Sequence, residues 1–160
     1  MLVIHVIDGN PVDGKLVFEV NGNPNSGASE AEKRWPVQWI VRQSNGNPVA
    51  RITSIKMKTG PNAPQSTDIF AGDGRRPRSH AGGINWDAKV ASNAQDFAEY
   101  HYDIGWVPKN STAILTHDPL ISIRPRKWRP WEMGALLGLL GLTLLVLGRK
   151  KKKPRRQGQF

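Results

Sequence analysis

The segment Glu99-Tyr-His-Tyr-Asp-Ile-Gly-Trp106 decides the fold class. Aromatic or branched apolar residues alternate in it with polar or small ones, and a period of two is typical of a β-strand that buries one face. The same alternation recurs at residues 16–20, 37–42 and 84–90. No long stretch of the first 123 residues has helical periodicity, so we expect an all-β domain.

Turn signals separate the predicted strands. The sequences Asp8-Gly-Asn-Pro11, Asn21-Gly-Asn-Pro24 and Asn45-Gly-Asn-Pro48 each follow an apolar run. Asn-Gly and Asp-Gly tolerate a positive φ, and proline ends a hydrogen-bonded ladder, so each tetrapeptide predicts a chain reversal. Seven or eight short strands without helices predict an antiparallel β-sandwich over residues 1–123.

One long loop is predicted at residues 59–83, which are rich in Gly, Pro and Asn. Ile69 and Phe70 form a short apolar anchor within it. Arg75, Arg76 and Arg78 are clustered in the same segment. We expect these arginines to be the exposed feature that meets a partner protein.

The positive charge of the chain belongs to its C-terminal part. Residues 1–123 contain 12 basic and 12 acidic side chains, while residues 124–160 contain 11 basic side chains against Glu132 alone. These 37 residues therefore account for the whole net charge of +10. A nucleic-acid-binding domain carries its excess Lys and Arg on the folded body, so nucleic acid is not expected as a partner.

The apolar run at residues 133–148 lies between two basic segments and contains no charged residue. As a helix it covers roughly 24 Å, and flanking residues extend this toward the ~30 Å hydrocarbon core of a bilayer. We therefore predict a basic juxtamembrane linker at 124–132, a transmembrane helix at 133–148 and a polybasic tail at 149–160. The expected membrane-interface residues are Trp128, Trp131, Arg149, Lys150, Lys151, Lys152 and Lys153.

Orientation follows from the charge on the two sides of this helix. Seven basic residues follow it and four precede it, which favours a cytoplasmic tail and an extracytoplasmic β-domain at the cell membrane. The first eight residues lack the features of a signal peptide and instead have the pattern of a strand. Gly134 and Gly138 form a G-x-x-x-G pair that permits close contact with another helix.

The order of motifs in residues 2–123 resembles that of cupredoxin-like β-sandwich domains. The resemblance rests on the Trp-containing strand at 37–42, the Ile-Thr-Ser-Ile-Lys-Met strand at 52–57, the Tyr-His-Tyr strand at 100–104 and the closing His-Asp-Pro-Leu-Ile-Ser-Ile segment at 117–123. It implies that the last two of these segments form a C-terminal hairpin. It implies nothing about copper by itself.

Copper chemistry is limited by the composition. A blue-copper centre needs a Cys thiolate, and the chain contains no cysteine. His80, His101 and His117 are the candidate ligands of a cysteine-free site, although solvated surface histidines are the simpler interpretation. No cofactor is expected.

Three classes of function remain open. The favoured one is a non-enzymatic, membrane-anchored β-sandwich that acts as a binding or accessory subunit of a membrane protein complex. Its expected partners are the lipid bilayer and one or more membrane proteins. The alternatives are a copper-handling domain that uses histidines, and a surface protein whose Pro-Trp-Glu motif at 130–132, apolar helix and basic end form a C-terminal sorting signal.

Overall fold

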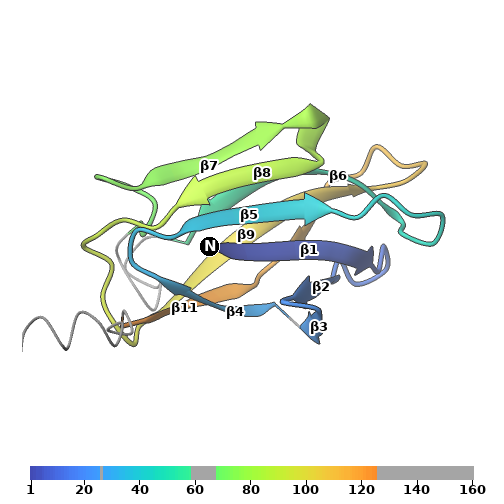
Figure 1. Ribbon diagram of the computed structural model, residues 1–160. Coiled ribbons are helices and arrows are strands. Elements are labelled where there is room, and N and C mark those ends of the chain that lie inside the picture. The colour runs from blue at the N-terminus through green and yellow to red at the C-terminus, as the bar shows by residue number, and fades with distance from the viewer. Residues whose placement is uncertain (26, 59–67, 126–160) are drawn as a thin grey trace, which may run out of the picture. The chain divides into compact units, whose positions relative to one another are not determined.

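The computed structural model describes residues 1–25, 27–58 and 68–125, and these form a two-layered all-β domain (Figure 1). The strands are β1 (Leu2–Gly9), β2 (Leu16–Val20), β3 (Asn23–Asn25), β4 (Ala28–Glu32), β5 (Pro36–Val41), β6 (Val49–Met57), β7 (Arg75–His80), β8 (Asn85–Lys89), β9 (Glu99–Pro108), β10 (Leu115–His117) and β11 (Leu120–Arg124). One short 3-10 turn, η1 (Ala81–Gly83), joins β7 to β8. The predicted all-β class is confirmed.

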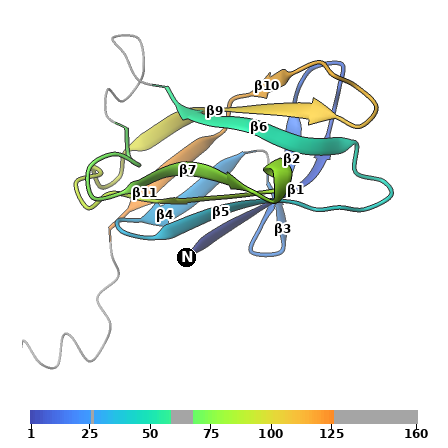
Figure 2. The same cartoon turned by 90° about the horizontal axis from the view of Figure 1, so that it is seen from above.

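Two sheets share the strands. One has six strands in the order β3-β2-β1-β5-β8-β7, and the other follows the order β10-β9-β11-β4, with β6 also paired to β9. Seen from above, β6 and β9 lie in one layer and β1, β5 and β7 in the other (Figure 2). Strand β9 pairs antiparallel with both β10 and β11, which forms the expected C-terminal hairpin.

Two pairings correct the prediction of a purely antiparallel sandwich. Strand β1 runs parallel to β5, and β4 runs parallel to β11, so both sheets are mixed. Alternation of apolar and polar residues reports which face of a strand is buried. It carries no information about the direction of the neighbouring strand, and for that reason the sequence could not reveal these pairs.

A second correction concerns the predicted loop at 59–83. Residues 75–80 form β7, which is an edge strand that pairs with β8 on one side. Its Arg-Arg-Pro-Arg-Ser-His sequence has no buried position, so it shows none of the alternation that identifies a half-buried strand. Ile69 and Phe70 are fully buried, as expected of the apolar anchor.

The inner faces of the two sheets supply one core. Its largest fully buried side chains include Trp39, Tyr102 and Trp106. Trp39 donates a buried hydrogen bond from Nε1 to the hydroxyl of Tyr102 at 3.1 Å, and this bond ties the two sheets together. Burial raises the pKa of Tyr102 above its usual range, so the phenol stays neutral. The remaining domain tryptophans, Trp35 and Trp86, are partly buried and pack against this core.

Asn47 is one of two buried polar residues among those that the structure describes. Its Nδ2 donates to the carbonyl of Val6 at 3.2 Å and to that of Arg42 at 2.6 Å, while its Oδ1 accepts from the amide of Val49 at 2.8 Å. The side chain therefore joins β1 to the turn between β5 and β6.

Each of the three tetrapeptides lies where one strand ends and the next follows, but only one forms the positive-φ turn that its sequence predicts. At Asn21-Gly22 both residues have positive φ, 53° and 80°, as a two-residue turn between antiparallel strands requires. Asp8 and Gly9 still belong to β1, and the positive φ of the β1–β2 connection is at Gly14. The Asn45 motif lies between β5 and β6, and neither Asn45 nor Gly46 has a positive φ.

The transmembrane prediction lies outside the described residues, as do the linker, the tail, the interface residues from Trp128 to Lys153, and the pair Gly134 and Gly138. Within residues 1–125, apart from the gaps at 26 and 59–67, no helix is long and apolar enough to cross a bilayer.

Candidate binding groove on the six-stranded sheet

The hairpin of β7 and β8 positions the candidate site. Its connection, Ala81-Gly82-Gly83, has three consecutive positive φ angles of 49°, 67° and 93°. A Cβ at Gly83 would lie 2.4 Å from the carbonyl oxygen of Ile52, so this position needs glycine. Because the turn packs closely on β6, β7 is held beside β8 at the edge of the sheet.

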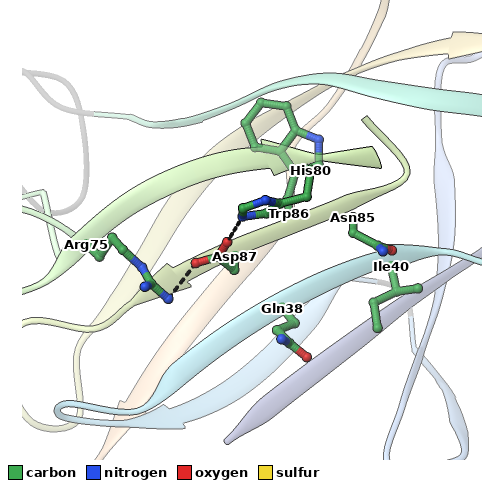
Figure 3. A pocket seen from close by; sticks show the side chains of 7 residues that line it. All are labelled: Gln38, Ile40, Arg75, His80, Asn85, Trp86 and Asp87. Atoms are coloured by element: carbon green, nitrogen blue, oxygen red, sulfur yellow. Dashed lines mark hydrogen bonds and ion pairs between the residues drawn. The ribbon is translucent and has the colours of Figure 1, made fainter. Parts of the chain in front are cut away.

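Three neighbouring strands place polar side chains around one hollow. In the sheet register, Gln38 of β5 is paired with Asp87 of β8, and Asn85 of β8 is paired with Ile40 on one side and His80 on the other. Together with Arg75 and Trp86 these side chains line an open groove of about 550 Å³, which we call the Asp87 groove (Figure 3).

Asp87 organises the charges of this groove. Its Oδ2 pairs with Nη2 of Arg75 at 2.5 Å, and its Oδ1 is in close contact with Nε2 of His80 (Figure 3). The Asp87 side chain is 18% exposed, whereas those of Arg75 and His80 are 50% and 60% exposed. The Arg75 and His80 side chains are therefore the more exposed partners, and the Asp87 carboxylate is the more buried one.

The groove is equipped for recognition. Gln38 and Asn85 offer amide donors and acceptors, Arg75 offers donors with positive charge, and His80 offers ring nitrogens. No Ser, Thr or Cys is among the side chains that line it, and its one carboxylate is already engaged. The lining side chains can make hydrogen bonds and ion pairs with a polar ligand.

A second hollow lies on the opposite face of β7, toward β6. Ile55, Lys56 and Met57 of β6 and the residues Asp68, Arg76 and Pro77 line a groove of about 360 Å³, which we call the Arg76 groove. Nε of Arg76 pairs with Oδ2 of Asp68 at 3.3 Å, and the Arg76 side chain is 75% exposed. Strand β7 therefore separates two grooves.

The candidate histidine ligands lie on different sheets. His80 is on β7 of the six-stranded sheet, whereas His101 and His117 are on β9 and β10 of the other sheet. Among the described residues, no three His, Asp or Glu side chains converge as a metal site would require.

His101 lies in a charged cluster on the five-stranded sheet. Its Nδ1 is 3.6 Å from Oδ1 of Asp118. Lys58 pairs with Asp118 at 2.6 Å and with Asp103 at 3.4 Å. The hydrogen bond with Asp118 is the main reason that the pKa of Lys58 is raised, so Lys58 is protonated at neutral pH. This cation already compensates the carboxylates that a metal ion would need.

The contacts of His117 are those of a residue that links two strands. Its Nδ1 accepts a hydrogen bond from the amide of Leu16 at 3.3 Å, and its ring lies 5.4 Å from that of Phe18. Its Nε2 is buried without a partner among the described residues. Burial lowers the pKa of His117, so the ring is neutral near pH 7 and links β10 to β2 across the two sheets.

Sequence reasoning identified Arg75, Arg76 and Arg78 but missed Asp87 and the amides beside it. The sequence does contain a signal for the β7–β8 hairpin that carries Asp87. Gly82-Gly83 ahead of the alternating segment 84–90 is a hairpin signal, and it predicts a strand before it as well as after it. A comparison of the sequence with known protein families and with curated proteins finds no match.

Proposed function

We propose that this chain is a non-enzymatic, membrane-anchored binding domain that serves as an accessory subunit of a membrane protein complex. The β-domain contacts the partner through β7 and the Asp87 groove. The apolar helix at residues 133–148 holds the domain at the bilayer, with the tail on the cytoplasmic side and the β-domain outside.

One observation carries this proposal: three arginines lie on an exposed sheet edge beside an open polar groove. Arginine is favoured at protein interfaces because its planar guanidinium makes several hydrogen bonds at once. Residues 1–123 contain equal numbers of basic and acidic side chains. Three arginines on one strand are therefore a local excess of positive charge, which favours contact with a negatively charged surface of a partner protein.

The membrane anchor is supported by the sequence. The 16 residues from 133 to 148 carry no charge and are flanked by tryptophans and basic residues in the order expected of a single-pass segment. A tethered domain meets membrane partners at a high effective concentration, so even a small contact surface is sufficient for stable association.

The test is affinity purification of the full chain from native membranes in mild detergent. We expect stoichiometric membrane proteins to be retained, and we expect their loss in a variant that combines Arg75→Ala, Arg76→Ala and Arg78→Ala. A matched control combines Lys15→Ala, Arg42→Ala and Lys109→Ala, which removes the same charge from other elements. Lys15 and Arg42 each pair with a carboxylate, as Arg75 and Arg76 do.

A chain that purifies alone would contradict the proposal. Equal loss of partners from the β7 variant and from the control would contradict the assignment of the surface.

A further inference from the structure

Strand β7 is the last strand at one end of the described six-stranded sheet. Among the described strands it pairs only with β8, and five of its six residues are exposed. An exposed sheet edge offers backbone amides and carbonyls to an additional strand. The edge is therefore a site where an extended polypeptide can add to the sheet.

Side chains of β7 face two different hollows. Arg75 and His80 line the Asp87 groove, while Arg76 and Pro77 line the Arg76 groove. Successive side chains of a strand point to opposite faces. A segment that lies beside β7 would therefore direct its side chains alternately toward the two grooves, and such alternation gives specificity in strand addition.

The charge of this edge selects an acidic partner. Asp87 pairs with Arg75 and Asp68 pairs with Arg76, which leaves Arg78 without an ion-pair partner among the described residues. Lys56 adds a further cation at the border of the Arg76 groove. The side chains of Arg75 and Arg76 are 50% and 75% exposed, so each guanidinium can pair with a second carboxylate.

The edge also limits what can bind. Pro77 has no amide hydrogen, and the ladder with β8 is irregular between Arg75 and Arg78. Only the Arg78–His80 half continues as a regular strand. These features oppose indiscriminate sheet extension and favour a short segment whose charges supply much of the affinity.

We propose that β7 is the docking site for a short, extended, acidic segment of the partner protein, which adds to the six-stranded sheet beside Arg78–His80. The segment directs carboxylates toward Arg75 and Arg78 on one side and toward Arg76 on the other. This inference rests on the proposed function and specifies the chemistry of the partner.

The probe is a fluorescent eight-residue peptide in which Glu-Glu and Val-Val pairs alternate, so that each face of the extended strand carries carboxylates. It is titrated against the full chain in a neutral detergent and followed by fluorescence anisotropy. We expect saturable binding that weakens with added salt, and no binding of the corresponding Lys-Val peptide. The variant with Arg75, Arg76 and Arg78 changed to Ala should bind about tenfold more weakly. The control variant at Lys15, Arg42 and Lys109 should bind as the parent does.

Backbone pairing is tested with the same peptide methylated on alternate amide nitrogens, which keeps the charges and removes donors. We expect methylation in one of the two alternating sets to abolish binding, because only one set faces β7. Unchanged binding by both methylated peptides would overturn the strand-addition model.

Vesicles that contain phosphatidylserine separate this partner from a lipid surface. The polybasic tail is the same in both variants, so it cancels in their comparison. If the β7 variant loses vesicle binding relative to the control and neither variant differs in peptide binding, the edge recognises lipid and the inference is wrong. A different result would be that native partners co-purify with the parent but not with the β7 variant, while the peptide does not bind. That result would support the proposed function and contradict the inference of an acidic segment.

Discussion

Replacement of Asn47 by alanine tests the buried link between β1 and the β5–β6 turn. The change removes two donated hydrogen bonds and one accepted bond. The carbonyl of Val6 keeps a second donor, the amide of Arg42 at 2.9 Å, and the carbonyl of Arg42 is only partly buried. The main cost is the buried amide of Val49, which loses its acceptor.

An unsatisfied buried donor together with the lost hydrogen bonds is worth about 3 kcal/mol. We expect N47A to lower the free energy of unfolding by this amount. Asn47→Asp has nearly the same volume, but it replaces the donating nitrogen by an oxygen that faces two carbonyls, so we expect it to cost at least as much. Together the two variants separate lost hydrogen bonds from lost packing.

Urea denaturation of the full chain in detergent, followed by tryptophan fluorescence, measures the effect through the buried indoles of Trp39 and Trp106. The chain supplies two matched controls, since Asn10 and Asn23 occupy the same position of the repeated tetrapeptide but are exposed. N10A and N23A should each cost less than about 0.5 kcal/mol. If N47A cost no more than these controls, the assignment of Asn47 as a structural link would be refuted.

Three further outcomes are expected. The free energy of unfolding should fall as the pH decreases from about 7 through 6.5 and below. Burial lowers the pKa of His117, so the unfolded chain binds more protons than the folded one in this range. In H117Q this part of the pH dependence of the urea midpoint should be absent. Gly83→Ala should destabilise by more than 1 kcal/mol, because it combines a positive φ with a clash against Ile52, and a melting temperature that did not change would contradict this. Full-length protein should sediment with membranes after ultracentrifugation without detergent and resist alkaline extraction, whereas a chain that lacks residues 133–160 should stay in the supernatant.

Much of the fold could be predicted from the sequence where one face of a strand is buried. Residues 100–106 alternate so regularly because Tyr100, Tyr102, Ile104 and Trp106 all enter the core, and the buried positions confirm this assignment. Strand β7 could not be found in this way, since the edge of a sheet imposes no alternation on residues that solvent surrounds. The prediction of seven or eight strands was too low for the same reason, because β3, β7 and β10 contain no buried residue.

The candidate site shows the same division. The three arginines are close together in the sequence, so they could be identified before the fold was known. The role of Asp87 depends on two pairings across strands, with Arg75 and His80, and such pairings depend on the register of the hairpin. The repeated tetrapeptides give a similar lesson, because identical local sequences at Asn23 and Asn47 end in exposed and buried environments that only tertiary packing distinguishes.

The central position of β1 determines when this domain can complete its structure. Strand β1 lies between β2 and β5, and the parallel partner of β4 is β11, the last strand of the domain. A nascent chain can therefore form the β1–β2 hairpin early, but its apolar face stays uncovered until residues close to the predicted membrane segment have been synthesised. Such dependence on distant contacts makes folding slow compared with that of a helical protein of equal length. Until the last strand has been synthesised, the uncovered apolar face is a surface through which unfinished chains can aggregate.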